Sequence, residues 1–327
     1  MEKDLENLLL PYGRPELCTS LLPALLDGIA GIAESLHQSH HVSQAGTTNA
    51  FGDGQLNVDI SAENIIRAAL ARCPSVLTAS SEEEPVERAA SDNQTKDGVA
   101  STAEQYTVAF DPLDGSSIIA PNWTVGTIIG IWDGASAINQ QPSTKQVAAV
   151  MGVYGPRTTA VVALNVPGGK PSCIEIGIGK PGSQDHQLIR PNLHLAEPPF
   201  KTRYFAPANL RAAAESEAYM RLITQFVEKK YTLRYSGGLV PDILHALVKG
   251  HGVYISPVTS ASDAKLRRLY ELFPIALVIL CAGGKAVDPA NGEDILSRPV
   301  MDCDERAGLI CGTADEVDNV MKALLGA

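Results

Sequence analysis

Acidic residues follow two short β-prone runs of this sequence, and this arrangement constrains the fold more than any other feature. The alternating run 106–110 leads into Asp111-Pro-Leu-Asp114, and the apolar run 76–78 is soon followed by Glu82-Glu83-Glu84. A bare Asp-x-x-Asp-Gly string is usually a surface turn, because Asp and Gly favour turns. Two strand ends that both deliver carboxylates predict instead a single shared site.

The chemistry of that site follows from the residue types. Asp111 and Asp114 are three residues apart across a Pro-containing turn, so both carboxylates can face one point. Close carboxylates repel one another unless a positive charge lies between them. Mg²⁺ and Mn²⁺ prefer hard oxygen ligands, and Mg²⁺ often bridges carboxylates to a substrate phosphate. Gly115, Ser116 and Ser117 can offer backbone N–H groups to an anion at a helix start. The sequence thus predicts adjacent metal and phosphate sites.

Bulk properties exclude several classes of protein. The chain has 327 residues, 45% hydrophobic and 19% charged, which is typical of a soluble protein with one or two domains. A net charge of −11 disfavours binding to nucleic acid. The six cysteines form no C-x-x-C pair, which favours reduced thiols in a cytoplasmic protein. We find no targeting signal and no apolar run of 18 residues, so we expect no membrane span.

The pattern of apolar residues predicts an α/β fold with two domains. Helices are predicted at 16–37, from Ser61, and at 212–229, 240–249 and 265–282, with an interruption at Pro274. Strands are predicted at 106–110, 124–132, 147–153, 159–164, 173–177, 202–206, 252–256 and 308–311. Residues 84–104 read as a loop, and Thr313-x-x-Glu316 predicts a capping box for the last helix. A composition shift at Glu197-Pro-Pro199 divides domain 1–198, which carries the metal residues, from domain 199–327, which binds substrate.

Several motifs in the same order resemble those of the fructose-1,6-bisphosphatase family, within the lithium-sensitive phosphatase superfamily. They are Gly52-Asp53, Val58-Asp59, Ser81-Glu82-Glu83, Asp111–Ser117, Arg234-Tyr235-x-Gly-Gly and Lys265-Leu-Arg-Arg-Leu-Tyr-Glu271. The resemblance covers nearly the whole chain. It implies a two-domain, layered α/β/α/β/α sandwich and the hydrolysis of a sugar 1-phosphate with two or three Mg²⁺ ions, or Mn²⁺.

The resemblance also implies roles for individual residues. The metal ligands would be Glu82, Asp111, the Leu113 carbonyl, Asp114 and Glu271. Asp53, Asp59 and Glu83 would be catalytic, since Asp53 and Asp59 would help bind a further metal and position the attacking water. The substrate ligands would be Gly115, Ser116, Ser117, Asn209, Arg234, Tyr235, Lys265 and Arg267. The family's equivalent of Arg234 reaches across a subunit interface, which implies a homodimer or homotetramer. Taken alone, Lys265 and Arg267 would read as the solvated face of a helix.

Within the family, the chain most resembles the sedoheptulose-1,7-bisphosphatase branch. Ile118-Ile119 follows the metal loop where the fructose branch has Asn-Ile, and Ser256 stands in place of a bulky Tyr. A smaller residue can leave room for a seven-carbon sugar. Ala120 departs from the Asp usual in both branches, which leaves open how metal or water is placed beside it.

Other substrates and roles remain open at this point. A fructose-1,6-bisphosphatase or dual-specificity enzyme is the nearest alternative, and an inositol-type monophosphatase or an inactive metal-binding scaffold is more remote. Gln105 and Asp133 replace cations of the AMP-inhibited branch, so we expect no inhibition by AMP. His37, His40 and His41 lack partners at metal spacing and are predicted to be exposed.

Overall fold

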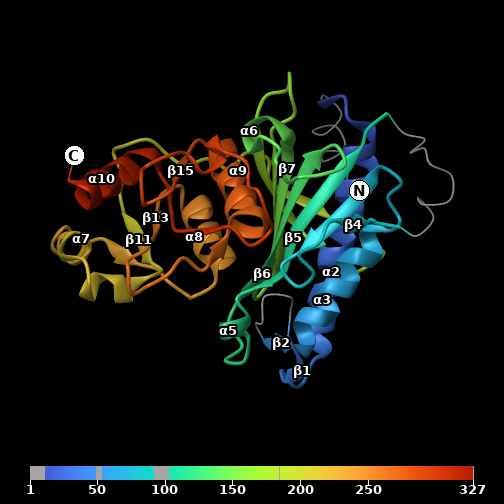
Figure 1. Ribbon diagram of the computed structural model, residues 1–327, viewed down its shortest axis with the longest axis horizontal. Coiled ribbons are helices and arrows are strands. Elements are labelled where there is room, and N and C mark those ends of the chain that lie inside the picture. Colours follow the sequence, from blue (N-terminus) through green and yellow to red (C-terminus); the bar gives the residue numbers. More distant parts are fainter. Residues whose placement is uncertain (1–11, 49–53, 92–102, 184, 327) are drawn as a thin grey trace.

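The computed structural model describes residues 12–48, 54–91, 103–183 and 185–326, which form five layers in the predicted order α/β/α/β/α. From right to left in Figure 1, the helices α2 (Leu22–Gln38) and α3 (Asn57–Leu70) cover one face of a large sheet. Helices α8 (Leu239–Lys249) and α9 (Phe273–Cys281) lie between this sheet and a smaller one. Helices α7 (Glu217–Glu228) and α10 (Ala314–Leu325) cover the outer face of the smaller sheet.

The large sheet has eight strands in the order β10-β9-β8-β7-β6-β5-β3-β4. Its strands are β3 (Val76–Ser81), β4 (Arg88–Ala89), β5 (Tyr106–Asp114), β6 (Val125–Asp133), β7 (Gln146–Tyr154), β8 (Thr158–Leu164), β9 (Ser172–Gly177) and β10 (Gln187–Arg190). The pair β3–β5 is parallel, whereas every other neighbouring pair is antiparallel. Every residue of β5 and β7 is buried, because helices cover both faces of the sheet.

The smaller sheet has five strands in the order β12-β11-β13-β17-β15. Its strands are β11 (Tyr204–Pro207), β12 (Thr232–Leu233), β13 (Val253–Ser256), β15 (Lys285–Val287) and β17 (Leu309–Gly312). Strand β11 pairs in parallel with β12 and β13, and β17 runs antiparallel to β13 and β15. The shorter elements are the pair β1 (Gln44–Thr48) and β2 (Gly54–Leu56), α5 (Ser116–Ile119), α6 (Pro142–Lys145), η3 (Leu210–Ala214) and η5 (Ile295–Ser297).

The first predicted helix is present and forms part of the core. A π-helical turn η2 (Leu17–Leu21) runs directly into α2. In the described part of the chain, Leu17–Gln38 is the one helical segment that is long and apolar enough to cross a membrane, by length and composition alone. Most of this stretch is buried, and Leu25 and Ile29 belong to the core beneath the large sheet. It therefore acts here as a core helix.

The predicted helix 265–282 is wrong at its start. Leu266 and Arg267 form a short strand β14, paired with β16 (Arg306–Ala307). The helix starts with the π-helical turn η4 (Arg268–Leu272) and continues as α9. Pro274 has no N–H to donate, so a wide turn closed by the bond from Phe273 N to the Arg268 carbonyl precedes the regular helix. This wide turn places Glu271 inside the fold.

Other boundaries also differ from the predictions. Helix α3 begins at Asn57 rather than Ser61, because the Asp59 side chain accepts a hydrogen bond from the Leu56 N–H at 2.9 Å and caps the first turn. Strand β4 lies within the predicted loop 84–104, of which residues 92–102 lie outside the described chain. The predicted turn after Phe110 is instead a continuation of β5 with a register shift between Asp111 and Asp114.

The capping box predicted for the last helix is also wrong. Helix α10 does begin after Thr313. The Thr313 hydroxyl, however, accepts a hydrogen bond from Gly252 N at 3.1 Å instead of capping the helix. Glu316 points into the protein, where its carboxylate accepts from the Tyr231 hydroxyl at 2.9 Å and lies 3.1 Å from His251 Nε2. This buried polar contact joins α10 to the residues that lie just before β12 and β13.

We expect Glu316→Ala to lower the free energy of unfolding by about 3 kcal/mol, because Tyr231 and His251 would lose a buried acceptor. Glu217→Ala is the matched control, since Glu217 is 93% exposed and pairs with Arg221 on the surface. Its cost should stay below about 1 kcal/mol. Urea unfolding followed by circular dichroism measures both, and equal losses would contradict a structural role for the buried contact.

Candidate active site

The predicted carboxylates meet because β3 and β5 are parallel neighbours. Parallel strands end at the same edge of a sheet, so Glu82 after β3 lies beside Asp111 in β5. The Glu82 N–H donates to the Phe110 carbonyl at 3.0 Å, which fixes the two strand ends together. The π-helical turn η4 packs against β5 and β6 and brings in Glu271. Residues 82, 111, 114 and 271 therefore come together from three distant parts of the chain.

Asp111 and Asp114 are held by backbone N–H groups. The Asp111 Oδ1 accepts from Leu113 N at 3.0 Å. The two oxygens of Asp114 accept from Leu239 N at 3.1 Å and from Val240 N at 2.7 Å, which are the first amides of α8. The positive end of a helix stabilises a carboxylate in this position. Each oxygen keeps a second lone pair, so these bonds fix Asp114 without using up its capacity as a ligand.

Arg267 lies among these carboxylates. Its guanidinium donates to Glu82 Oε1 and, through Nε, to Asp304 Oδ1 at 3.3 Å, and its backbone N–H donates to Glu271 Oε2 at 2.6 Å. Arg267 is buried, unlike Lys265, which is exposed. The two basic residues that the sequence places together as substrate ligands therefore have different surroundings. Asp304 was missed as a partner of Arg267, although it lies in the Asp302–Arg306 segment that resembles the sedoheptulose branch.

Burial and mutual repulsion make these carboxylates hard to ionise. Burial, and then the charges of Glu82, Glu271 and Asp114, hold the pKa of Asp111 well above its usual range. The pKa of Glu271 is raised by the same burial and by Glu82. Burial raises the pKa of Asp114 to about 6, against the opposing effect of its two backbone hydrogen bonds. A bound cation would relieve this repulsion.

The chemistry of the donors fits a divalent metal ion. Glu82, Asp111, Asp114 and Glu271 are hard oxygen donors, and strand pairing and the packing of η4 bring them to one edge of the large sheet. Within the described residues, no three side chains are already arranged around a common point as metal ligands. Glu82 faces Arg267 instead, so metal binding would require this side chain to turn. Leu113, whose carbonyl was predicted as a further ligand, lies buried between the two aspartates.

Of the predicted catalytic residues, Asp59 and Glu83 lie close to one another and next to Glu82 in the turn 81–84. Asp59 is in the first turn of α3, and its Oδ1 is buried with no hydrogen-bond partner in the described part of the chain. Burial, opposed by the Leu56 N–H and supported by the charge of Glu83, brings the pKa of Asp59 to about 6. Glu83 accepts a hydrogen bond of 2.5 Å from Gln55 Nε2. Asp53 lies outside the described residues.

The Gly-Ser-Ser segment turns sharply after β5. Gly115 has φ of 95°, which favours glycine, and it precedes the short helix α5. Ser116 and Ser117 are exposed at the start of α5, where the sequence predicts a phosphate. Ala120, the departure from the family pattern, is exposed directly after α5.

The predicted ligands of the distal phosphate gather at the end of β11. The Asn209 amide donates to the Pro257 carbonyl at 2.7 Å and to Ser262 Oγ at 2.8 Å. The Tyr235 hydroxyl donates to the Ala208 carbonyl at 2.9 Å. Arg234 is exposed, and its guanidinium lies over the Tyr204 ring at 5.8 Å. These residues belong to the smaller sheet and its loops.

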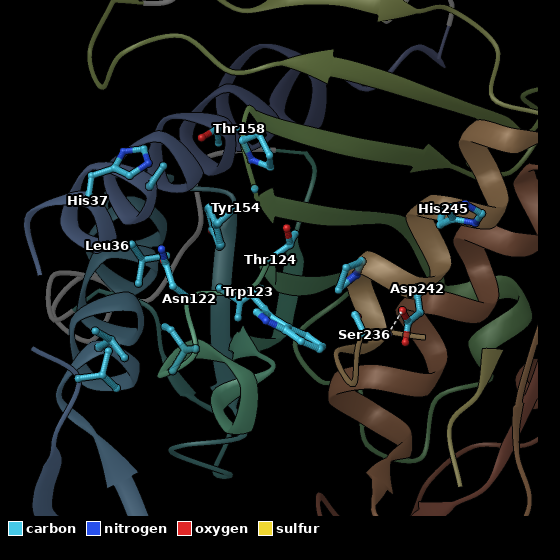
Figure 2. A pocket seen from close by; sticks show the side chains of 18 of the residues that line it. Leu36, His37, Asn122, Trp123, Thr124, Tyr154, Thr158, Ser236, Asp242 and His245 are labelled. Atoms are coloured by element: carbon cyan, nitrogen blue, oxygen red, sulfur yellow. Dashed lines mark hydrogen bonds between the residues drawn. The ribbon is translucent and has the colours of Figure 1, made fainter. Parts of the chain in front are cut away.

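A large cavity adjoins this region without containing the carboxylates. Its volume is about 780 Å³, and it lies between the end of α2, the β6–β8 side of the large sheet and α8. Figure 2 shows Trp123 extending into it, with His37 on one side and Asp242 and His245 on the other. It reaches the predicted substrate residues through Arg234 and Tyr235.

Remaining sequence predictions can also be placed. His37, His40 and His41 are exposed, as predicted, and the six cysteines form no disulfide. Asp133, at the position compared with the AMP-inhibited branch, forms two hydrogen bonds with Arg14 at 2.8 and 2.9 Å. It is therefore held in an ion pair, and the absence of AMP inhibition stays a prediction.

Comparisons with known proteins agree across the chain. Models described as "Fructose-1-6-bisphosphatase, N-terminal domain" and "Fructose-1-6-bisphosphatase, C-terminal domain" match residues 12–180 and 199–325. The chain is 38% identical to the chloroplastic sedoheptulose-1,7-bisphosphatase of Chlamydomonas reinhardtii, over 89% of this chain and 70% of that protein. It is 33% identical to the class 1 fructose-1,6-bisphosphatase of Syntrophotalea carbinolica, over 96% of this chain and 91% of that protein.

Solved structures show the same similarity. A crystal structure from Toxoplasma gondii, provisionally assigned as a sedoheptulose-1,7 bisphosphatase, matches with a TM-score of 0.85 and 35% identity over 98% of both chains. The holo form of Leishmania major fructose-1,6-bisphosphatase matches with a TM-score of 0.80 and 25% identity, over 96% of this chain and 95% of that chain.

We expect Asp114→Asn to lower phosphate release from a sugar bisphosphate by more than about 100-fold, since even residues behind a metal ligand are worth 10–100-fold. The amide fits the same space and keeps one acceptor for the α8 amides, so the fold should persist. Asp318→Asn is the control, because Asp318 is 60% exposed and pairs with Lys285. Turnover within tenfold of wild type in Asp114→Asn would contradict its role as a ligand.

Stability should also depend jointly on pH and Mg²⁺. The folded pKa values of Asp59 and Asp114, about 6, lie above the usual value near 4, so folding favours their protonated forms. The metal-free protein should therefore lose stability as pH rises from about 4 through 6. Mg²⁺ should raise the melting temperature more at pH 8 than at pH 5. Thermal unfolding with and without Mg²⁺ measures this, and an equal increase at both pH values would contradict it.

Proposed function

The chain belongs to the fructose-1,6-bisphosphatase family and is a sugar bisphosphatase, a phosphoric monoester hydrolase, and we propose that its preferred substrate is sedoheptulose 1,7-bisphosphate. The products would be sedoheptulose 7-phosphate and phosphate, and the proposed cofactor is Mg²⁺ in two or three ions.

One observation carries the choice of sugar. Ser256 ends β13, directly before Pro257, whose carbonyl accepts a hydrogen bond from the Asn209 amide. Residue 256 therefore adjoins the group proposed to bind the distal phosphate. A Ser there occupies far less volume than the Tyr of the fructose branch, which leaves space for one more CHOH unit. The identity to plant and algal sedoheptulose-1,7-bisphosphatases, 35–38%, supports the same choice.

The described residues suit the hydrolysis of the 1-phosphate. Such monoesters hydrolyse very slowly unaided, so charge stabilisation must supply most of the acceleration. Bound Mg²⁺ would neutralise charge on the phosphoryl and leaving oxygens. Glu82, Asp111, Asp114 and Glu271 would hold the ions, and Ser116 and Ser117 would contact the phosphoryl oxygens.

The attacking water would be oriented by Asp59 and Glu83. Asp59 Oδ1 is buried and has no partner among the described residues, so it can accept a hydrogen bond from a water. With a pKa of about 6, Asp59 is largely ionised above neutral pH yet basic enough to accept a proton. Asn209, Arg234 and Tyr235 would bind the far phosphate and fix the sugar's direction.

The exposed edge of the smaller sheet supports a homodimer or homotetramer. Strand β12 is one of the two edge strands of this sheet, and Leu233 at its end and Arg234 and Tyr235 after it are all exposed. A partner subunit could cover the apolar side chains and receive the Arg234 guanidinium, as the family resemblance implies. Oligomeric state would be measured by light scattering.

A fructose-1,6-bisphosphatase or an enzyme with both activities is the second candidate. The 33% identity to a class 1 fructose-1,6-bisphosphatase extends over nearly the full length of both proteins, which favours retention of some activity on the shorter sugar.

We expect kcat/KM to be about 10–200-fold higher for sedoheptulose 1,7-bisphosphate than for fructose 1,6-bisphosphate, the range typical of one small group in a pocket. Ser256→Tyr should shift this ratio toward the six-carbon sugar. Ser143→Tyr, on the exposed surface of α6, is the control and should leave the ratio unchanged. Phosphate release under identical Mg²⁺ measures the ratios. A wild-type preference for the fructose ester would overturn the proposed substrate, and no release from either ester would indicate an inactive scaffold.

A further inference from the structure

We propose that Glu63 and Arg67 of α3 are positioning residues that hold the turn 81–84, so that the backbone of Glu82 and Glu83 stays beside the catalytic centre. The proposal rests on the proposed function, because it assigns these two residues to the same centre. Neither residue belongs to any of the motifs identified in the sequence, and neither is itself placed as a metal or substrate ligand.

The turn is closed at both of its ends. The Ser81 N–H donates to the Glu84 carbonyl at 3.1 Å, and the Glu84 N–H donates to the Ser81 hydroxyl oxygen at 2.9 Å. Glu82 and Glu83 are the two residues between these closed ends. The backbone position of Glu82 and Glu83 therefore depends on the contacts that fix Ser81 and Glu84.

Glu63 fixes the Ser81 end. The Ser81 hydroxyl donates to Glu63 Oε1 at 2.9 Å, and both residues are buried. The same oxygen accepts from Arg67 Nε in an i,i+4 pair on α3. Glu63 Oε2 is buried without a hydrogen-bond partner among the described residues. The Glu63 charge therefore depends strongly on Arg67 for compensation.

Arg67 fixes the Glu84 end. Its second guanidinium nitrogen lies 3.2 Å from Glu84 Oε2 and also reaches Ser81 Oγ at 3.5 Å. The guanidinium lies 5.7 Å from the centre of the Phe110 ring, one residue before Asp111. Arg88 pairs with the other oxygen of Glu84. One guanidinium thus contacts the helix, both ends of the turn and the residue that leads into the metal loop.

The number of carboxylates around the turn 81–84 explains why a positively charged side chain is needed at position 67. Glu82, Glu83 and Glu84 are consecutive, and Glu63 adds a fourth carboxylate behind them. Like charges at this spacing repel and would open the turn. Arg67 pairs with both Glu63 and Glu84 and offsets that repulsion. Glu82 pairs with Arg267, and Glu83 pairs with Gln55.

Helix α3 also carries Asp59, the residue proposed to orient water, and so connects it to the contacts of Glu63 and Arg67 with the turn 81–84. Asp59 and Glu63 are four residues apart in α3, so they lie on one face of the helix. Asp59 caps the first turn, and Glu63 and Arg67 follow on the next two turns. Movement of α3 would therefore displace Asp59 and the turn 81–84 together.

The test is Arg67→Met, which keeps the length and the apolar contact but removes the cation. We expect Mn²⁺ to bind about 10–100-fold more weakly to the full-length variant, as measured by electron paramagnetic resonance of free Mn²⁺. We also expect kcat to fall by a similar factor while KM for the bisphosphate at saturating Mg²⁺ stays within twofold. Arg67→Lys should recover part of the Mn²⁺ affinity, because an ammonium can pair with one carboxylate but not span both.

Arg72→Met is the matched control. Arg72 follows the end of α3, is 60% exposed and pairs with Asp27, so its loss should leave Mn²⁺ affinity and kcat unchanged. Mn²⁺ affinity and kcat within twofold of wild type in Arg67→Met would overturn the proposal. Equal losses in Arg67→Met and Arg72→Met would overturn it as well, because the effect would not be specific to the turn.

A second variant covers the case in which Arg67→Met does not fold, as judged by circular dichroism. Ser81→Ala removes only the hydroxyl that joins Glu63 to the Glu84 N–H, and wild-type Mn²⁺ affinity in this variant would then overturn the proposal. If the wild type releases no phosphate from either bisphosphate, the proposed function fails. The Mn²⁺ measurements still decide whether Glu63 and Arg67 support the carboxylate turn.

Discussion

The parallel pairing of β3 with β5, inside a sheet that is otherwise antiparallel, is the constraint on which the rest of the site depends. Two strands that end at the same edge bring Glu82 beside Asp111, although these residues lie far apart in the sequence. Antiparallel pairing would send these carboxylates to opposite edges. The helices that cover both faces of the sheet then bury this edge, and burial is the main reason why the pKa values of Asp111 and Asp114 are raised.

Concentrated negative charge is costly, and the surrounding structure offsets it at three points. The first amides of α8 bind both oxygens of Asp114. Arg267 pairs with Glu82, and Arg67 pairs with Glu63 and Glu84 behind the turn. These partners explain how the carboxylates can stand close together before any metal binds. The carboxylates still outnumber these positive partners. A divalent cation that bound among them would therefore gain a favourable electrostatic free energy.

Apolar runs predicted most of the strands, because alternating or continuous apolar runs identify buried strands directly, whereas the layers were predicted from the family resemblance. It could not place Glu271 by spacing, since a π-helical turn ahead of Pro274 and the packing of η4 on β5 bring it to the site. It gave Glu316 a local capping role, whereas Tyr231 and His251 offer a buried tertiary contact instead. It also missed Glu63 and Arg67, because a Glu–Arg pair four residues apart in a helix is ordinary until the fold shows what lies beside it. The hydrogen bonds from the α8 amides to Asp114 could not be predicted either, because backbone N–H groups are present at almost every residue.

Helix α8 connects the two ends of the proposed substrate site. Its first amides bind Asp114, and the segment just before it carries Arg234 and Tyr235. Asp242 in its first turn accepts from the Ser236 N–H at 2.8 Å, which ties that segment to the helix (Figure 2). Gly126 lets the helix pack this closely, because an added Cβ would lie 2.5 Å from Val240. The distance from the metal loop to Arg234 is therefore set by rigid packing. For the proposed substrates, a difference in sugar length would then be accommodated where Ser256 adjoins Asn209, since a single side chain there can change the available volume.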